Sequence, residues 1–520
     1  LGIVLLATFA FAAASRTGLY LVLFLMASQS ALFGPAKYGI VPELVGRHQL
    51  SRANSLLEGA TYLAIILGCG LASTLAQLSA TDYQIAAFSC IGFSVLGILS
   101  SRKIEKTAPA VTSPKTSRSC RELRETVSEL RADNHLLLAI VGAAYFLFFG
   151  AFAQINLIPL GILSHGLTQE QSGYLFLVAA LGIGIGSYLA GKLSGRNVEL
   201  GLIPLGAIGM SLSCCGLFLL PNNLLAHLGL IALLGCSSGL FLVPLHAFIQ
   251  MRAPREKLGR ILATSSFISW LGVLAASGFA YILREQFSYS AEQSFFILGL
   301  LTCGLTLLTI KILPDFLLRF LILLSIRIGY RLKTHGAENV PSEGPALLVA
   351  NHTSWIDALL LTATQQRRIR FVMHRAIYNK RLLQPIFKRM GVIPVAANDT
   401  RKQKLEFIKT ARQAIADDYL VCIFAEGMIS RNGMLNRFQS GFEAIVKRTD
   451  CPIIPIYIGG VWGSIFSYAN GKPLSKLPQR IPFPVAIHFG EPLPADSSAE
   501  KVQQQVSELG HTHVNTLQST

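Results

Sequence analysis

Two hydrophobic patterns divide the chain near residue 313. Before this point, apolar runs of about 20 residues, the length that crosses a bilayer as a helix, follow one another with short polar breaks. After it, short apolar runs alternate with polar helical stretches, which is typical of an α/β domain. The chain is therefore predicted to be multi-domain, with an all-α polytopic membrane bundle followed by an α/β domain. The ten predicted spans are 1–15, 19–40, 53–78, 85–99, 136–163, 172–193, 200–220, 224–248, 261–283 and 294–313.

The second pattern predicts the strands and the domain limits. Strand-like runs occupy 346–351, 368–373, 392–395, 419–427, 451–459 and 484–490, and a polar helix is predicted over 401–417. We expect a membrane region over 1–313 that includes a polar linker at 101–133, a connector over 314–333, and the α/β domain over 334–520. The connector is apolar with spaced arginines. It is interpreted either as an interfacial amphipathic helix or as a helix whose apolar face packs on the domain.

Composition supports a membrane protein, and loop charge orients it. Charged residues are 14% and hydrophobic residues 52% of the chain, whereas soluble proteins carry about 25% charge. Most Lys and Arg of the membrane half lie in alternate loops near 47–52, 101–131, 192–196 and 252–260. The positive-inside rule places these loops, and the domain after 313, in the cytoplasm. The net charge of +17 is thus assigned to the membrane surface, not to nucleic acid. The nine cysteines lack metal-ligand spacing, so no metal site is expected.

Polar residues inside two predicted spans mark a candidate transport path. Lys37 follows a Gly-Pro pair in "ALFGPAKYGIVPEL" (31–44), and Asn54, Glu58 and Tyr62 recur every fourth residue in "ANSLLEGATYLAIILG" (53–68). Charge is costly in a bilayer unless it is used, so these four residues are candidates for the path. The alternatives are that Lys37 reaches the cytoplasmic surface along its flexible stem, and that the other three only pack helices.

These two stretches resemble bacterial lysophospholipid transporters of the major facilitator superfamily. The resemblance implies two six-helix halves, so the four helices before the linker indicate that two helices are missing. The chain begins at Leu1 and not at Met, and we expect it to be a fragment. A bacterial inner-membrane location follows from the same resemblance.

His352 and Asp357 are the candidate catalytic pair. They lie in "LLVANHTSWIDALLL" (347–361), where an apolar strand ends in the histidine. An imidazole can take a proton from an alcohol, and a carboxylate on its other nitrogen fixes the tautomer and stabilises the imidazolium. The alternative is a core or capping pair, because this spacing alone is a weak signal.

Further blocks follow in a fixed order: "GVIPV" (391–395), "FAEGMISRNG" (424–433) and "PIIPI" (452–456). Together with the histidine motif they resemble the glycerolipid acyltransferase family, and "WGSIFSYANGK" (462–472) resembles its 2-acylglycerophosphoethanolamine type. The resemblance implies that His352 is the general base, that Asp357 orients it, and that Glu426 and Gly427 contact the glycerophosphate of the acceptor. It implies no metal or cofactor, with acyl-acyl carrier protein or acyl-CoA as co-substrate.

Two departures from the family pattern affect phosphate binding. Ala425, Met428 and Ile429 replace the usual Pro, Thr and Arg of the third block, and "GVIPVAAND" (391–399) lacks the usual arginine. Arg431 is assigned to substrate binding, with Arg437 as a second candidate. Surface arginines exposed to water are the alternative for both.

The two halves together indicate a protein that moves lysophospholipid and re-acylates it. One alternative is a 1-acylglycerol-3-phosphate acyltransferase on a non-transporting anchor, and another is a transporter with a non-catalytic lipid-binding domain. Related fusions often carry an adenylate-forming domain, so the expected partners include a separate acyl-acyl carrier protein synthetase, unless the chain is also truncated at that end.

Overall fold

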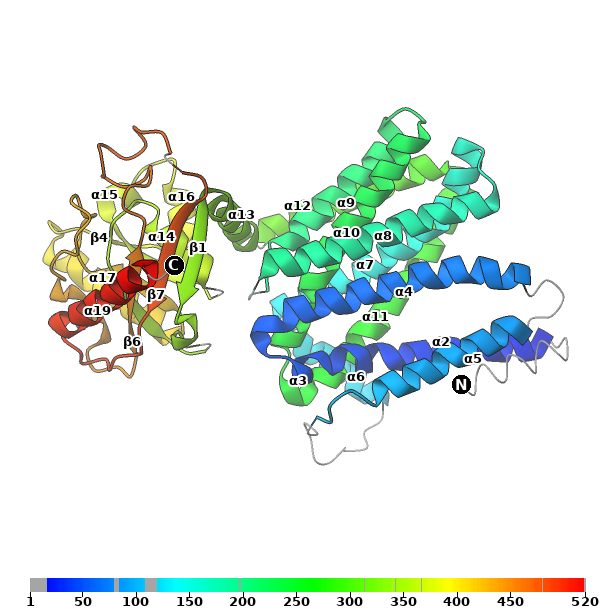
Figure 1. Ribbon diagram of the computed structural model, residues 1–520, viewed down its shortest axis with the longest axis horizontal. Coiled ribbons are helices and arrows are strands. Elements are labelled where there is room, and N and C mark those ends of the chain that lie inside the picture. Colours follow the sequence, from blue (N-terminus) through cyan, green and yellow to red (C-terminus); the bar gives the residue numbers. More distant parts are fainter. Residues whose placement is uncertain are drawn as a thin grey trace. The chain divides into compact units, whose positions relative to one another are not determined.

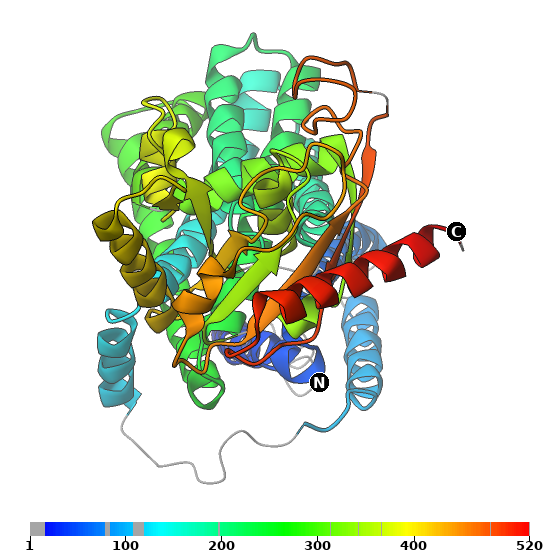
Figure 2. The ribbon, with the colours of Figure 1, turned by 90° about the vertical axis from the view of Figure 1, so that its left-hand side faces the viewer.

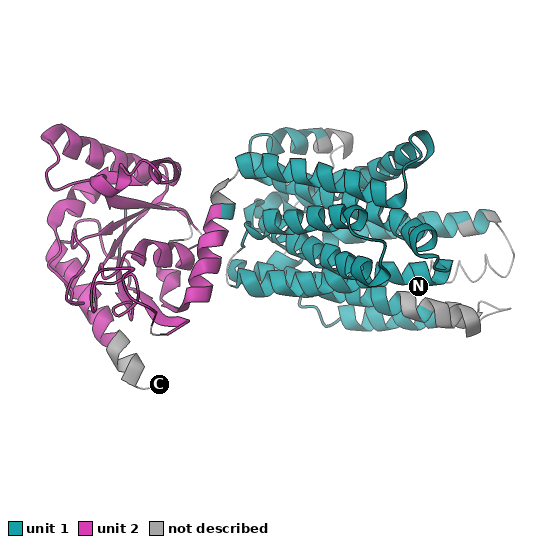
Figure 3. Cartoon of the chain, turned by 90° about the horizontal axis from the view of Figure 1, so that it is seen from above, with its two compact units in different colours: residues 1–317 teal, residues 318–520 magenta. Residues whose placement is uncertain are grey.

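The computed structural model describes residues 16–78, 84–107, 119–195, 198–312, 314–341, 343–365, 367–478 and 480–518. The chain divides into two compact units, Leu1–Leu317 and Leu318–Thr520 (Figure 3). The first predicted span, 1–15, lies outside the described residues. The other nine predicted spans all coincide with helices, so the helical character of the membrane half is confirmed.

The first unit is a bundle of long helices (Figure 1). Its elements are α2 (Arg16–Gly39), α3 (Val41–Leu44), α4 (Leu50–Leu78), α5 (Gln84–Ser101), α6 (Ser119–Leu130), α7 (Asn134–Pro159), α8 (Gln169–Ser194), α9 (Leu202–Leu219), α10 (Leu224–Arg252), α11 (Leu258–Tyr281) and α12 (Ala291–Ile312). Side-chain caps mark three of the starts, with Asp133 capping α7, Thr168 capping α8 and Asn223 capping α10. Among the described residues, six helical stretches are long and apolar enough to cross a membrane: Asn134–Ser164, Gln169–Ser194, Leu202–Leu219, Leu224–Arg252, Arg255–Gln286 and Ala291–Lys311.

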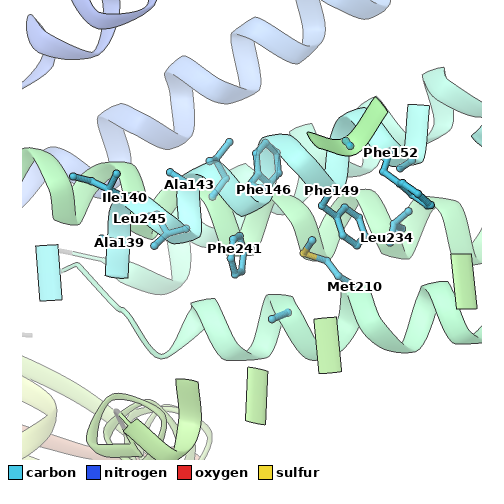
Figure 4. Packing of buried hydrophobic residues seen from close by; sticks show 14 of the residues in the cluster. Ala139, Ile140, Ala143, Phe146, Phe149, Phe152, Met210, Leu234, Phe241 and Leu245 are labelled. Atoms are coloured by element: carbon cyan, nitrogen blue, oxygen red, sulfur yellow. The ribbon is translucent and has the colours of Figure 1, made fainter. Parts of the chain in front are cut away.

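Aromatic and aliphatic side chains fill the interior of this bundle. Figure 4 shows Phe146 and Phe149 of α7 beside Phe241 of α10 and Met210 of α9. Elsewhere glycines bring the backbones of α8 and α10 together. A Cβ on Gly186 would clash with the backbone carbonyl of Cys236, so only glycine permits this approach. Small residues at helix contacts are the usual basis of packing in membranes, where apolar burial drives no association.

Polar contacts define the two ends of the bundle. At one end, Glu129 of the predicted linker pairs with Lys257 and Arg260, and Asp133 pairs with Arg252 at 2.7 Å. The hydrogen bond from Lys257, aided by the charge of Arg260, holds the pKa of Glu129 below its ordinary value. The linker, predicted as a polar segment, therefore ends in helix α6, whose Thr126 and Leu130 are buried.

The opposite end gathers the loops predicted to face away from the cytoplasm. Ser164, which follows α7, donates a hydrogen bond to Glu292 at the start of α12, and Asn222 donates to the carbonyl of Ser164 at 2.7 Å. His165 and His227 also meet there, with Nε2 and Nδ1 2.9 Å apart. Each group of contacts thus joins loops that the charge pattern assigns to the same side, while the side that faces the cytoplasm stays a prediction.

The second unit is an α/β domain built on one seven-stranded sheet with the order β1-β7-β6-β2-β5-β3-β4. The strands are β1 (Tyr330–His335), β2 (Ala346–Ala350), β3 (Ile369–His374), β4 (Ile393–Val395), β5 (Leu420–Phe424), β6 (Ile453–Gly459) and β7 (Phe483–Phe489). Only the β6–β7 pair is antiparallel among the pairs of this sheet in the described part of the chain. The predicted α/β class is confirmed. One strand was missed: β1 begins inside the predicted connector, because its alternating residues "YRLKTH" lack an apolar run.

Helices cover both faces of the sheet. They are α13 (Pro314–Gly329), α14 (Asp357–Thr364), α15 (Arg375–Tyr378), α16 (Gln384–Arg389), α17 (Arg401–Ala416), α18 (Glu443–Val446) and α19 (Ala499–Gln518). Residues of β2 alternate between two cores, which explains why this strand is apolar at every position. Leu348 packs with residues of α13 and α14, whereas Leu347 packs with α17, α18 and α19. Figure 2 shows α19 in red against the orange strands β6 and β7, which it contacts.

The connector helix α13 belongs largely to the α/β unit, which begins at Leu318. Its Ile326 is buried in the core with Leu348, and Ile322 packs against the same cluster. Leu321 and Ile328 are exposed. Helix α13 therefore packs one apolar side on the domain, while apolar residues on another side remain exposed.

Candidate active site and membrane polar cluster

The turn between β2 and α14 brings His352 and Asp357 together. β2 ends at Ala350 and α14 begins at Asp357. The segment between them folds back, so that the aspartate contacts His352. Its Oδ2 lies 2.9 Å from Nδ1 of His352 and accepts the amides of Thr353 at 2.8 Å and Ser354 at 2.9 Å. The segment from His352 to Asp357 therefore forms a turn in which these three nitrogen atoms converge on Oδ2 of Asp357.

This turn fixes the orientation of the His352 ring. Asp357 is fully buried, and its Oδ2 has the hydrogen-bond partners that a buried polar group requires. With Nδ1 turned toward Asp357, Nε2 is the ring nitrogen that can take a proton from a substrate. The His352 side chain is 19% exposed, and its ring stacks on Phe424 with centroids 4.1 Å apart. Both the direction and the plane of the imidazole are thus fixed.

Glu426 lies directly behind the histidine. Its Oε1 accepts the backbone amide of His352 at 2.7 Å, while its Oε2 accepts the amide of Asn436 at 3.1 Å and the Asn436 side chain at 2.7 Å. Burial raises the pKa of this carboxyl above its ordinary value, and the three hydrogen bonds oppose the rise. Gly427 then turns the chain with φ of 72°, a conformation that favours glycine. Glu426 therefore holds two loops together at the candidate site.

Two residues of this arrangement were missed in the sequence. Asn436 follows Glu426 by ten positions in a segment without regular structure, and no periodic or motif signal pointed to it. Phe424 had a signal, because it lies in the predicted strand 419–427, two residues before Glu426. Its use as a stacking partner required the sheet order, which places β5 next to β2.

The arginines have different environments. Arg431 is exposed, and its guanidinium lies 5.7 Å from the centre of the Tyr468 ring, while Arg437 is exposed as well. Their contact with a phosphate stays a prediction. Beside the second block, Arg375 binds both oxygens of Asp399 at 2.8 and 2.9 Å. An arginine thus does lie at this block, but it is the first residue of α15, directly after β3, and it is paired with a carboxylate.

An apolar cavity of about 410 Å³ opens beside the turn that holds His352 and Asp357. Its walls come from α13, from α14 and from the chain between β6 and β7. Ile356, which lines it, directly precedes Asp357. The other lining residues are Leu321, Ile322, Ser325, Ile326, Gly329, Tyr330, Leu359, Ser464, Ile465, Phe466, Pro478, Arg480, Ile481 and Phe483. The described residues contain no group of three His, Cys, Asp or Glu side chains placed to hold a metal ion.

A second polar site lies in the bundle, where α2, α4 and α10 meet. Asn54 is fully buried and exchanges hydrogen bonds with Gln250, at 2.6 Å and 3.2 Å. Gln250 also donates to the backbone carbonyl of Tyr38 at 3.0 Å. These contacts tie the helices before the linker to one after it.

Glu58 is the buried acidic residue of this site. It accepts the hydroxyl of Tyr38 at 2.5 Å and lies 3.2 Å from Nδ1 of His246. Lys37 donates to Thr61 at 2.6 Å, and Tyr62, one turn after Glu58, is partly buried. The structure therefore brings Asn54 and Glu58 into one network. His246 and Gln250 were missed, although polar residues four apart in the apolar helix α10 were a readable signal.

Comparison with known proteins assigns families to both regions. The family described as Major Facilitator Superfamily matches residues 1–277, and the family described as Acyltransferase matches residues 331–459. The lysophospholipid transporter LplT of Escherichia coli O1:K1 / APEC is 29% identical over 234 residues, as is that of Shigella boydii serotype 4 (strain Sb227). Each match covers 44% of this chain and 57% of the relative, so the chain spans a little over half the length of these transporters.

Two solved structures are similar to parts of the chain. The 1-acyl-sn-glycerophosphate (LPA) acyltransferase PlsC from Thermotoga maritima is 21% identical with a TM-score of 0.29, covering 39% of this chain and 82% of that one. The proton:xylose symporter XylE, bound to 6-bromo-6-deoxy-D-glucose, is 15% identical with a TM-score of 0.41, covering 53% and 66%. On the family matches, the chain belongs to the major facilitator superfamily and carries an acyltransferase domain after its multi-pass membrane region.

Proposed function

We propose that the chain is bifunctional: its bundle moves lysophospholipid across the bacterial inner membrane, and its cytoplasmic domain re-acylates the lipid on a free glycerol hydroxyl. The observation that carries the enzymatic half is the hydrogen bond between His352 and the buried Asp357. The likeness to the LplT transporters supports the transport half. The acceptor is proposed to be of the 2-acylglycerophosphoethanolamine type.

The proposed reaction transfers an acyl group from a thioester. Nε2 of His352 takes the proton of the glycerol hydroxyl as its oxygen attacks the thioester carbonyl, and Asp357 stabilises the imidazolium that forms. The tetrahedral intermediate then expels the thiolate, which recovers the proton from His352. The products are an ester and a free thiol, and the step requires neither metal nor cofactor. The donor is an acyl-acyl carrier protein or acyl-CoA.

The apolar cavity is the proposed seat of an acyl chain. Most of the side chains that line it are aliphatic or aromatic, and one of these, Ile356, adjoins Asp357 in the chain. A chain bound there would have its carboxyl end near the turn that holds His352. Glu426 keeps the His352 backbone in place, and its proposed contribution to the acceptor site acts through that position.

Transport is proposed to use the polar cluster of α2, α4 and α10. The cluster links the helices before the linker to α10 through the Asn54–Gln250 and Glu58–His246 contacts. These contacts are suited to break and reform as the two sides of the bundle move, which would expose a polar path to a lipid head group. Lys37 and Tyr62 remain candidates for the same path.

One variant separates this proposal from its alternatives. His352→Ala in the full chain, reconstituted in vesicles, is expected to abolish acyl transfer while labelled lysophospholipid still crosses the membrane. His511→Ala, at an exposed position of α19, is the matched control and should leave both activities intact. Acyl transfer without any transport by the wild type would indicate an anchored acyltransferase. Transport with no transfer by the wild type, supplied with either thioester, would indicate a lipid-binding domain.

A further inference from the structure

We propose that the loop between Ala469 and Pro482 inserts into the surface of an anionic lipid leaflet and forms the mouth through which a lipid chain reaches the apolar cavity. We call this segment the access loop; its described residues are 470–478 and 480–481. The proposal rests on and deepens the proposed acyl transfer, and it assigns a lipid contact to a segment outside the bundle and outside α13.

The access loop exposes three large apolar side chains. Leu477 is 88% exposed, Leu474 69% and Ile481 64%. Single exposed leucines are common, but three within one short loop form an apolar projection, and such projections mark interaction sites. Exposure of these three apolar side chains to water is unfavourable, so we expect a less polar partner to cover them.

Internal contacts hold the loop in this conformation. The amide of Leu474 donates to the carbonyl of Ile465 at 2.7 Å. Nζ of Lys476 donates to the carbonyl of Ser467 at 2.9 Å and to that of Ala469. Leu474 itself has φ of 65°, a left-handed conformation that marks a tight turn at this residue. The apolar side chains are therefore presented by a defined turn and not by an unstructured tail.

Charge favours a lipid leaflet as the partner of the access loop. Residues 451–490 contain no Asp or Glu, whereas Lys472, Lys476 and Arg480 all lie within the loop. Basic residues beside exposed apolar residues are the combination that binds anionic membrane surfaces, where both kinds of contact contribute. The domain also follows directly on a multi-pass membrane region, which keeps a leaflet within reach.

The access loop is continuous with the cavity and with the catalytic turn. Pro478, Arg480 and Ile481 line the cavity, so one segment forms both its wall and the exposed apolar tip. At its base, Ser467 forms a β-bridge with Ser354, and the amide of Trp355 donates to the carbonyl of Phe466 at 3.2 Å. A lipid chain could thus pass from the leaflet to the cavity along apolar side chains, without crossing water.

Insertion can be measured without catalysis. A single cysteine at Leu477, in the full chain with its native cysteines replaced, is labelled with an environment-sensitive fluorophore in vesicles of phosphatidylethanolamine and phosphatidylglycerol. We expect blue-shifted emission that nitroxide lipids quench. The same label at Gln504, an exposed residue of α19, is the control and should report water. Water-like, unquenched emission at position 477 would overturn the proposal.

A second measurement tests the access role. Leu474→Asp with Leu477→Asp should lower acyl transfer to vesicle-bound lysophospholipid by about tenfold, because charge opposes insertion of the loop. Transfer to a short-chain acceptor dissolved in detergent should be nearly unchanged. Leu405→Asp, at an exposed leucine of α17, is the matched control and should affect neither. Equal loss with both acceptors would contradict an access role, and quenching without any transfer by the wild type would contradict only the proposed function.

Discussion

The backbone amide of His352 donates to Oε1 of Glu426 at 2.7 Å, so the two residues are joined although they are far apart in the chain. Oε2 of the same carboxylate binds Asn436. One buried side chain therefore holds the backbone at His352 and the loop after β5 together. This relationship makes Glu426 a positioning residue for the candidate base.

Replacing Glu426 by Gln should lower acyl transfer by about 10- to 100-fold, since an amide cannot accept hydrogen bonds at both ends and one buried donor loses its partner. The measurement is the initial rate with saturating thioester. Glu443→Gln is the matched control, because Glu443 accepts the amide of Ala499 at 2.7 Å outside the candidate site. Similar losses of activity in both variants would contradict a specific role for Glu426.

Asp357→Asn should lower the rate by about 10³- to 10⁴-fold, because the amide no longer fixes the tautomer or stabilises the imidazolium. Membrane insertion and lysophospholipid transport should be retained, and they provide the internal control. Turnover like that of the wild type would end the assignment of His352 as a base held by Asp357.

The Arg375–Asp399 pair predicts a pH-dependent difference in stability. The hydrogen bonds from Arg375 hold the pKa of Asp399 below its ordinary value. A depressed pKa stabilises the folded state above the unfolded pKa of about 3.9, and that contribution is lost as the pH falls through the folded value. Asp399→Asn should therefore melt at a lower temperature than the wild type near neutral pH.

Thermal melts of the two proteins across pH provide the measurement. The difference in melting temperature should be constant near neutrality and shrink below a pH of about 4. A difference that grows on acidification would show that this ion pair does not stabilise the domain.

Glu58→Gln should slow transport of labelled lysophospholipid by about tenfold or more, since charged hydrogen bonds to Tyr38 and His246 are lost. Acyl transfer to a detergent-dissolved acceptor should be unchanged, because the domain is a separate compact unit. Glu43→Gln, at an exposed glutamate, is the control. Unchanged transport in the Glu58 variant would favour a packing role for this face of α4.

Topology can be tested with a membrane-impermeant maleimide. Single cysteines at Ser117 and Ser288, in a cysteine-free background, should label oppositely in intact cells, with only position 288 reacting. The reason is that basic loops resist translocation, and Ser117 lies in the most basic one. Labelling at position 117 would place the acyltransferase domain on the side that lacks acyl thioesters.

The sequence was informative where a run of apolar residues is enough to define a helix or a strand. Apolar runs located nine described helices, and the strand before His352 located the turn that joins His352 to Asp357. Contacts between distant segments could not be read in the same way: Asn436 reaches Glu426, and Gln250 reaches Asn54, only after the helices and strands have packed. The edge strand β1 was missed because it alternates buried and exposed residues and lacks an apolar run.

The position of β1 in the sheet has a consequence for synthesis of the protein. β1 leaves the ribosome first among the strands, but Tyr330 pairs with Phe483 and His335 with His488, at the end of β7. The last helix of the bundle, α12, ends at Ile312, so the whole membrane region can enter the bilayer while β1 still lacks its neighbour. Pairings between distant segments form slowly, so β1 stays unpaired in the nascent domain until β7 has been made. We therefore expect the newly made domain to depend on chaperones until β7 has been synthesised.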